Sequence, residues 1–397
     1  MSRRIAIFYA ATGAGHKAAA EALAETCSTL YPDSRVLLRD VLEYAPGWLR
    51  QGTVGSYRAM TRRFTWLWQR IYRDTDDPSG KRPLAFLWNE LHRTLSRPYL
   101  KYLFEDLDTF DPDAILTTHI FGMSALLDKW EHRTPIYFVG TDYLSHSLQR
   151  DPRFDGWFVG SAESARQHRA DNIPTSESTI LDFGIPIARK YLSPPSRRAA
   201  RHRLEVEDDR TMVTLVGGGI GAGPLATATE SMIDFTDWRI DVLCGNNHAL
   251  MERLRDRYYP FKHITVQGFV QNPEDYYAAS DVVVARPSGL TAAEATACAA
   301  AILLIDPLPG QDCANCDYLL EQGAARRIYD CRRAGEKIDE LIRTDLLLRM
   351  KNRATAIARP NAAEDILAFV MAQMEKRKQR HAPPQEPHDK QENGAAS

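Results

Sequence analysis

Short apolar runs alternate with longer mixed segments along most of the chain, and each run ends in a glycine or a polar turn. In the first half, the runs that predict strands are residues 5–10, 35–39, 114–118, 136–140, 156–159 and 179–183. In the second half they are residues 212–216, 239–244, 263–267, 281–285 and 301–305. Such short, continuously apolar strands are typical of parallel sheets that are buried on both faces. Their alternation with helical segments predicts an α/β protein with two doubly wound, Rossmann-like domains facing a central cleft.

The predicted boundary between the domains lies within residues 186–210, where a Ser-Pro-Pro-Ser stretch and a run of arginines interrupt the pattern. We therefore assign residues 1–187 to an N-terminal domain and residues 188–361 to a C-terminal domain. Residues 362–378 predict a last amphipathic helix. Residues 379–397 are rich in proline, glutamine and charged residues, which is typical of a disordered tail.

Two glycine-bearing turns, one in each half, carry the clearest chemical signal. Segments 5–18 and 282–294 each combine a buried strand, a glycine turn and the start of a helix. Such a turn leaves backbone N–H groups at a helix N-terminus, where partial positive charge favours an anion. Two such sites far apart in the sequence predict two α/β halves around a shared cleft, an arrangement that suits the joining of two substrates.

The first turn admits two interpretations. Gly13, Gly15 and Ala18 fit a loose dinucleotide fingerprint, with Asp40 where a ribose-binding acid would lie at the end of the second strand. Alternatively, His16 on the first helical turn points into the crevice, where a neutral imidazole is a reasonable general base. A purely structural role at the helix start is the simpler alternative for His16.

The second half offers three candidate binding segments. The glycine-rich stretch 217–223 can approach a phosphate closely, although it can equally be a plain turn. Residues 288–290 would present N–H groups to a diphosphate. Glu294, one helical turn further, can accept hydrogen bonds from ribose hydroxyls, or simply complement the helix dipole. Gln311 and Asp312 form a donor–acceptor pair suited to sugar hydroxyls, or belong to a Pro-Gly turn.

Further polar residues follow strands of the first half. Asp142, His119 and His146 come after predicted strands, so we expect them at the same sheet edge as His16. Asp142 is a second candidate base, and the two histidines are candidates to bind an acceptor or a phosphate. A structural role is the alternative for each histidine.

Residues 48–102 are rich in aromatic and basic side chains and fit helices. Cationic residues beside aromatic ones suit the headgroup layer of an anionic membrane. The alternative is that the aromatic residues are core and the arginines form a solvated face. The candidates for membrane contact are Arg62, Arg63, Trp66, Trp68 and Arg70.

Composition limits the kinds of binding partner that we expect among nucleic acid, metal ions and membranes. A formal net charge of −2 gives no general reason to expect nucleic acid. Cys313 and Cys316 form one C-x-x-C without the second pair that a zinc ribbon needs, so we expect no metal and reduced thiols in a cytosolic protein. From the sequence we expect no signal peptide, and no apolar stretch reaches the ~18 residues that span a membrane. Any membrane contact should therefore be peripheral.

Taken in order, these motifs resemble those of a known family. The specific parts are Gly13-Ala-Gly-His-Lys-Ala-Ala, Thr141-Asp142, Gly184-Ile-Pro, Pro287-Ser-Gly-Leu-Thr-Ala-Ala-Glu and Asp306-Pro-Leu-Pro-Gly-Gln-Asp-x-x-Asn. From about residue 5 to 325 the chain is similar to the processive diacylglycerol glucosyltransferases and monogalactosyldiacylglycerol synthases. These enzymes are relatives of the peptidoglycan N-acetylglucosaminyltransferase that makes lipid II.

The resemblance implies a GT-B glycosyltransferase without cofactor or metal. Such an enzyme would move glucose or galactose from a UDP-sugar, with inversion, to a lipid hydroxyl, above all diacylglycerol. It would act at the inner face of the cell membrane, with the N-terminal domain facing acceptor and membrane. The donor-binding residues that the resemblance implies are Gly217, Gly218, Gly219, Gly268, Phe269, Val270, Ser288, Gly289, Leu290, Thr291, Glu294, Pro309, Gly310, Gln311 and Asp312. Gly15 and His16 map to the acceptor side.

The chain departs from the family pattern at a few positions. Arg286-Pro-Ser-Gly stands where the family usually has Lys-Pro-Gly-Gly, and serine still offers an N–H to a phosphate. Asp312 replaces the common glutamate, and a shorter carboxylate can change which sugar is accepted.

Four rival functions stay open on sequence alone. They are a lipid-II-type N-acetylglucosaminyltransferase, a UDP-sugar epimerase, a nucleotide-binding oxidoreductase and a non-catalytic sugar-nucleotide sensor. Acceptor tests separate the first from the diacylglycerol enzymes. An epimerase needs no acceptor, and NAD affinity without UDP affinity would favour the oxidoreductase. The donor hexose, the number of sugars added and the oligomeric state are also left open.

Overall fold

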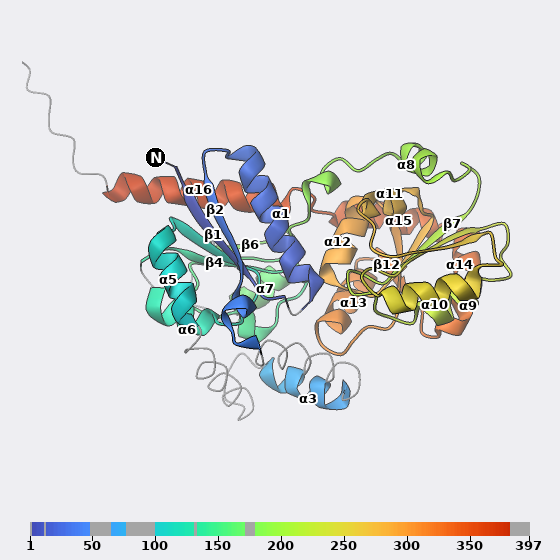
Figure 1. Cartoon of the computed structure of the whole chain (residues 1–397), viewed down its shortest axis with the longest axis horizontal. Helices are drawn as coiled ribbons and strands as arrows, with labels where there is room; N and C mark the ends of the chain where they lie inside the picture. Colours follow the sequence, from blue (N-terminus) through green and yellow to red (C-terminus); the bar gives the residue numbers. More distant parts are fainter. Residues whose placement is uncertain are drawn as a thin grey trace, which may run out of the picture.

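The chain folds into two lobes, each built on a six-stranded parallel sheet flanked by helices (Figure 1). The computed structural model describes residues 2–11, 13–47, 65–76, 100–130, 133–170 and 179–381. The sequence prediction of two doubly wound domains is confirmed, and the two sheets lie side by side along the long axis of the molecule.

The first lobe holds the sheet with strand order β2-β1-β3-β4-β5-β6. Its strands are β1 (Arg4–Tyr9), β2 (Arg35–Asp40), β3 (Ala114–Thr117), β4 (Ile136–Val139), β5 (Gly156–Phe158) and β6 (Ile180–Leu181). Its α-helices are α1 (Ala14–Leu30), α3 (Thr65–Thr75), α5 (Leu100–Phe110), α6 (Met123–Trp130) and α7 (Ala162–Ala170). Short 3-10 helices follow two strands, η1 (Val41–Tyr44) and η2 (Ser147–Gln149).

The second lobe holds the sheet with strand order β12-β11-β10-β7-β8-β9. Its strands are β7 (Met212–Val216), β8 (Arg239–Leu243), β9 (Ile264–Gln267), β10 (Val282–Ala285), β11 (Ala301–Leu304) and β12 (Ala325–Arg327). Its α-helices are α8 (Arg197–Leu204), α9 (Leu225–Glu230), α10 (His248–Tyr258), α11 (Pro273–Ala279), α12 (Gly289–Ala297), α13 (Gln311–Glu321), α14 (Ala334–Ile342) and α15 (Leu346–Ile357). The 3-10 helices η4 (Arg189–Tyr191) and η5 (Cys331–Arg333) complete it.

Continuous burial of the central strands explains why they read as unbroken apolar runs. Every residue of β3, β4, β7, β10 and β11 is buried. Helices cover both faces of each sheet, so alternate side chains of one strand enter different cores. The predicted strands are confirmed within a residue or two. The short edge strand β12 was not predicted.

The last helix, α16 (Ala362–His381), leaves the second lobe and returns to the first. Its buried residues Ile366, Leu367 and Val370 share a core with strands of the first sheet, and the helix lies against α1 (Figure 1). The helix ends at His381 rather than at the predicted 378, so the first residues of the predicted disordered tail are helical because they extend this packed helix. The rest of that tail, 382–397, lies outside the described residues.

The strand orders place one switch point in each lobe. In the first sheet, β1 lies between β2 and β3, and in the second sheet β7 lies between β8 and β10. At such a point successive connections run to opposite faces, which opens a crevice at the carboxyl ends of the strands. The segments after β1 and β3 and those after β7 and β10 are therefore the expected ligand sites. Within the described ranges, no helix is both long and apolar enough to cross a membrane.

Candidate active site

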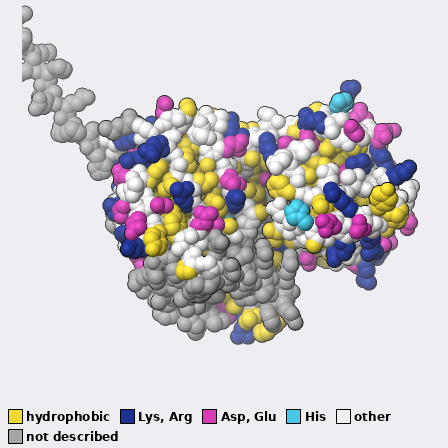
Figure 2. Space-filling model, in the orientation of Figure 1, with side chains coloured by type: hydrophobic (Ala, Val, Ile, Leu, Met, Phe, Trp, Pro, Cys, Tyr) yellow, Lys and Arg dark blue, Asp and Glu magenta, His cyan; other side chains and the backbone are white. Residues whose placement is uncertain are grey.

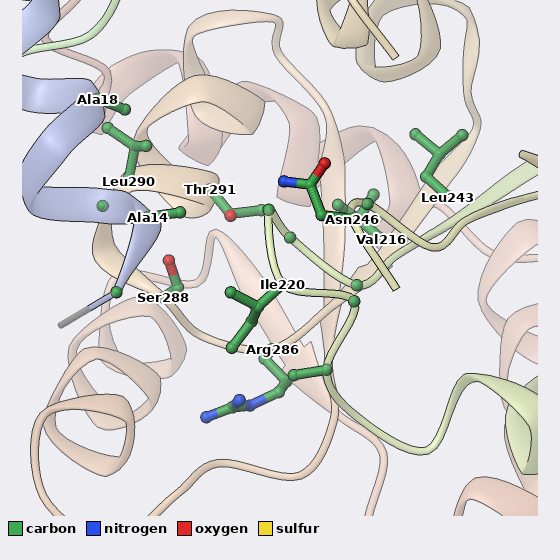
Figure 3. A pocket seen from close by; sticks show the side chains of 18 of the residues that line it. Ala14, Ala18, Val216, Ile220, Leu243, Asn246, Arg286, Ser288, Leu290 and Thr291 are labelled. Atoms are coloured by element: carbon green, nitrogen blue, oxygen red, sulfur yellow. The ribbon is translucent and has the colours of Figure 1, made fainter. Parts of the chain in front are cut away.

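A cavity of about 1070 Å³ lies between the two lobes and takes its lining from both (Figure 3). Figure 3 shows Ala14 of α1, Ser288 before α12 and Ile220 of the glycine-rich loop around the same space. Most of the residues predicted as a site converge here. Those that line the cavity are Gly15, His16, Asp142, Gly217, Gly218, Gly219, Gly268, Phe269, Val270, Ser288, Gly289, Leu290, Thr291, Glu294, Gln311 and Asp312.

Two helices begin at this cavity without a side-chain cap. Among the described side chains, none caps α12, whose N-cap is Ser288, or α1, whose N-cap is Gly13. The first N–H groups of a helix have no partner within the helix, and the helix dipole adds positive potential there. Uncapped helix starts that line a cavity are therefore suited to an anion such as a diphosphate.

The glycine-rich loop after β7 is shaped by positions that only glycine adopts easily. Gly218 and Gly221 have φ angles of +64° and +62°, in the left-handed region. The N–H of Gly217 donates to the carbonyl of Leu243 at 2.9 Å. A Cβ on Gly219 would lie 2.8 Å from the Cβ of Ala14 in the first lobe. The loop therefore brings bare backbone to the junction of the two lobes.

His16 is held in one orientation by the segment that follows β3. Its Nδ1 lies 2.7 Å from the carbonyl oxygen of Thr118 and 3.2 Å from Oγ1 of Thr141. Because a carbonyl only accepts, Nδ1 carries the proton and Nε2 keeps the basic lone pair. Burial lowers the pKa of His16, while the carboxylate of Asp142 opposes that shift. The imidazole is therefore neutral near pH 7, the form that a general base needs.

Asp142 follows β4 and is hydrogen-bonded to a residue of the second lobe. Its Oδ1 accepts a hydrogen bond from Nδ2 of Asn315 at 2.7 Å. Burial raises the pKa of Asp142, and the neighbouring Asn315 amide, His16 and Gln311 partly offset that rise. Asp142 and His16 thus influence each other's pKa, and both line the cavity. Their role in proton transfer stays a prediction.

Glu294 lies on α12 and lines the cavity. Burial raises its pKa to about 7, and the charge of Lys190 partly offsets the shift. The hydroxyl of Tyr277 lies 3.5 Å from its carboxylate. The hydroxyls of Tyr191 and Tyr277 also favour the ionised carboxylate. The contact of Glu294 with a ribose stays a prediction.

Gln311 and Asp312 line the cavity but also have protein partners. Gln311 donates from Nε2 to the carbonyl of Leu144 at 3.0 Å and accepts from the hydroxyl of Tyr72. Asp312 pairs with the guanidinium of Arg286. Contacts to sugar hydroxyls at these two residues stay a prediction, and a bound sugar would have to share or replace these partners.

Four predicted residues do not line the cavity, namely Pro309, Gly310, His119 and His146. His146 caps η2, where its Nδ1 accepts from the N–H of Leu148 at 3.1 Å, and its Nε2 lies 3.2 Å from the carbonyl of Tyr72. His119 packs edge-on against His16, with ring centroids 4.6 Å apart. Both geometries favour a supporting role over direct ligand contact.

The ribose acid of the dinucleotide interpretation is engaged elsewhere. Asp40 accepts hydrogen bonds from the N–H groups of Leu42 at 2.9 Å and Ala11 at 3.2 Å. It caps η1 and does not line the cavity. This placement argues against a dinucleotide site in the first lobe.

The predicted membrane residues are described only in part. Trp66 on α3 is 67% exposed and the Arg70 side chain is 73% exposed. Figure 2 shows hydrophobic and basic side chains together at the lower edge of the molecule, over α3. Arg62, Arg63 and the side chain of Trp68 lie outside the described residues. Membrane contact by this segment stays a prediction.

Several residues that complete the site have no predicted role. Arg286, Asn315 and Tyr72 pair with predicted site residues across long sequence separations, and Lys190 lies at the cavity wall. Arg286 and Asn315 stand inside the quoted motifs. Their place in these motifs was the one sequence feature that could have indicated a role in the site. The motifs alone did not show which groups each side chain contacts.

Comparison with known sequences identifies relatives over most of the chain. The sequence profile of the monogalactosyldiacylglycerol (MGDG) synthase family matches residues 16–187, the first lobe. A processive diacylglycerol beta-glucosyltransferase from Bacillus mycoides (strain KBAB4) is 25% identical over 384 residues, covering 93% of this chain and 94% of the relative. These matches confirm the resemblance inferred from the motifs.

Solved structures show the same fold at low sequence identity. MurG from Acinetobacter baumannii superposes with a TM-score of 0.54 and 16% identity, covering 93% of this chain and 99% of that one. A UDP-GlcNAc 2-epimerase from Neisseria meningitidis, solved with UDP-GlcNAc bound, gives a TM-score of 0.59 and 10% identity, covering 93% of this chain and 100% of that one. Similarity at this level establishes the GT-B fold. The reaction has to be inferred from the residues of the site.

Proposed function

Because this chain is related to the diacylglycerol glycosyltransferases and has the GT-B fold, we propose that it transfers a hexose from a UDP-sugar to the hydroxyl of diacylglycerol. The relatives are named glucosyltransferases, which favours glucose as the hexose. The proposal includes inversion at the anomeric carbon and peripheral attachment to an anionic membrane through the segment that contains α3.

One observation carries the proposal: the uncapped start of α12 lies directly against the segment that carries Asp142, at the wall of the cavity that His16 also lines. A Cβ on Gly289 would overlap the carbonyl oxygen of Thr141 and lie 2.9 Å from the Cα of Asp142. A diphosphate bound at this helix start would therefore hold its sugar beside His16 and Asp142. An anion site and a proton acceptor in one cavity are what glycosyl transfer from a nucleotide-sugar requires.

The donor would lie mainly on the second lobe. Uracil would contact the backbone of residues 268–270, and the ribose hydroxyls would donate to Glu294. The diphosphate would lie between the glycine-rich loop and residues 288–291, which form the uncapped start of α12 at the cavity wall. Gln311 and Asp312 would reach the sugar hydroxyls.

The acceptor hydroxyl would enter from the first lobe. His16 Nε2 is the first candidate to take its proton, with Asp142 as second candidate or as the charge that supports the imidazolium. The alkoxide oxygen then bonds to the anomeric carbon on the face opposite UDP while the bond to the diphosphate oxygen breaks. The sugar is thereby inverted, and UDP leaves with the bonding electron pair.

Negative charge grows on the diphosphate as that bond breaks. The helix start of α12 and the loop N–H groups are preorganised to stabilise this charge, and Arg286 adds a cation at the cavity wall. Loss of one such contact typically costs about 10²–10³ in turnover. Contact between the lobes also excludes water from the reacting centre and orients the two substrates.

The test is a donor and acceptor panel with the purified full chain. UDP-glucose, UDP-galactose and UDP-GlcNAc would each be supplied with diacylglycerol vesicles or a lipid-II-type acceptor. Mass spectrometry of the lipids and NMR of the anomeric configuration would identify the product. We expect a β-hexosyl diacylglycerol. A product formed only on the lipid-II-type acceptor, or a free epimerised UDP-sugar without any lipid product, would contradict the proposal.

A further inference from the structure

A buried amide on α13 reaches from the second lobe into the first. The side chain of Asn315 is fully buried. Its Nδ2 donates to Oδ1 of Asp142 at 2.7 Å, and its Oδ1 accepts from the N–H of Tyr143 at 2.9 Å. One side chain of the donor lobe therefore fixes both the backbone and the carboxylate of a loop in the acceptor lobe.

Other residues of α13 contact the same loop. Gln311 donates to the carbonyl of Leu144 at 3.0 Å, and the ring of Tyr318 stacks on Tyr143 with centroids 4.7 Å apart. Positions 311, 315 and 318 recur at helical spacing, so they form one face of α13. That face anchors the loop. On it, Asn315 lies at the distance of a strong hydrogen bond from the Asp142 carboxylate.

We propose that Asn315 is a positioning residue that orients the Asp142 carboxylate toward the reacting hydroxyl only while the two lobes are in contact. The inference rests on the proposed function, in which Asp142 is either the base or the charge that supports His16. Its consequence is that donor-lobe closure prepares proton transfer on the acceptor lobe, so the bases are not fully aligned before the donor lobe is in place.

The local charges give this role a measurable signature. The groups that face Asp142 come from three helices. They are His16 on α1, then Asn315, Gln311 and Asp312 on α13, and Tyr72 on α3. Burial raises the pKa of Asp142, and the Asn315 amide lowers it by bonding to the ionised form. Either proposed role needs the carboxylate ionised. Removing the amide therefore raises the pKa of Asp142 and moves the acid limb of the activity profile to higher pH.

Two substitutions separate anchoring from orientation. Asn315→Asp keeps an oxygen that accepts from Tyr143 but loses the donor to Asp142, whereas Asn315→Ala loses both bonds. We expect kcat at pH 7 to fall about 10²-fold in each variant, since small misalignments at a reacting centre cost that much. The acid limb of kcat should move up by about one pH unit or more in Asn315→Asp. The KM for the UDP-sugar should change less than about threefold.

Tyr318→Leu is the matched control on the same face of α13. It removes the stacking on Tyr143 and leaves the amide, so it loosens the loop without unpairing Asp142. Its pH profile should match that of the unaltered protein. Calorimetric titration with UDP and thermal unfolding would establish that each variant is folded, and Asn315→Ala carries the test if Asn315→Asp does not fold.

A double variant decides whether Asn315 acts through Asp142. In an Asp142→Asn background, Asn315→Ala should add less than about a twofold loss. A fully additive loss, or an unchanged pH profile in both Asn315 variants, would overturn the inference. Full activity of Asp142→Asn alone would instead remove Asp142 from the proposed mechanism, and the inference would fall with it while glycosyl transfer itself stood.

Discussion

The two lobes present their switch points to the same cavity but fill them with different chemistry. The first lobe offers titratable side chains, His16 and Asp142, each fixed by hydrogen bonds at 2.7 Å. The second lobe offers backbone N–H groups at the start of α12 and a glycine-rich loop whose positive φ angles exclude most side chains. The turn before α1 and the turn before α12 are two copies of the same kind of strand–turn–helix motif.

The two turns differ in the residue that follows the glycine, which is His16 after Gly15 and Leu290 after Gly289. An imidazole on the first helical turn changes its charge with pH. The backbone N–H groups at a helix start give a fixed positive potential that does not titrate. The second lobe also brings titratable side chains to the cavity, among them Asp312 and Glu294, and burial raises the pKa of Glu294 to about 7. Variants on the two lobes should consequently fail in different ways.

The largest effect is expected on the acceptor side, from His16→Ala. Without its neutral imidazole, turnover should fall about 10³-fold, the usual scale of a general base. UDP affinity, measured by calorimetry, should stay within about threefold because the donor lobe is unaltered. His202→Ala, at an exposed histidine on α8, is the control and should behave like the unaltered protein. Normal turnover in His16→Ala would remove this histidine from the mechanism.

Steric separation of the lobes should cost less. Gly289→Ala places a methyl group against the carbonyl of Thr141 and forces the start of α12 away from Asp142. We expect kcat/KM to fall about 10²-fold. Gly47→Ala is the control, since no atom of the described residues lies within 4 Å of its added Cβ. If Gly289→Ala is as active as Gly47→Ala, transfer does not need the close contact between the lobes.

A smaller, pH-dependent effect is expected at Glu294. If its ionised carboxylate accepts from ribose, the donor KM should rise as pH falls below its pKa of about 7. Glu294→Gln should raise KM about tenfold at pH 8 and abolish that pH dependence. Because burial favours the protonated form, Glu294 should also make folding less favourable as pH rises from 4.5 to about 7, and Glu294→Gln should lack that loss in urea denaturation. An unchanged KM profile would place the ribose elsewhere.

The smallest effect is expected at the proposed membrane-facing surface of the first lobe. Arg70→Glu on α3 should weaken binding to anionic vesicles about fivefold or more, since each basic residue near such a surface contributes about 1 kcal/mol. Arg343→Glu, at the C-cap of α14, is a close match. Both arginine side chains are about equally exposed, at 73% and 75%, and both pair with an aspartate one helical turn away. Equal losses in vesicle sedimentation would show general charge attraction rather than docking by the first lobe.

The sequence predicted the sheets well because their strands are buried on both faces, which leaves unbroken apolar runs. It missed β12, whose sequence Ala-Arg-Arg shows no apolar period and which pairs only with β11 at the sheet edge. It also predicted α16 as a helix without indicating which lobe the helix covers. An amphipathic pattern shows that a helix has a buried face, but the partner of that face depends on the path of the chain.

The candidate site divides in the same way. Residues within local turns, such as His16 and Gly289, were predicted because strand, glycine and helix signals adjoin them. The pairing of Asn315 with Asp142 and of Arg286 with Asp312 joins segments whose contact is set by the docking of the lobes or of neighbouring loops. His146 was predicted at the ligand because it follows a strand, yet its hydrogen bonds attach α3 to the first lobe.

The return of α16 has a practical consequence for protein engineering. Both the start and the end of the described chain belong to the same lobe, and the two crossing segments touch where a Cβ on Gly184 would overlap Arg359. In topological terms the second lobe is a single continuous insert in the first. Exchanging that insert between homologues needs only two splice points, both at this crossing, and would test whether the proposed donor preference moves with the second lobe.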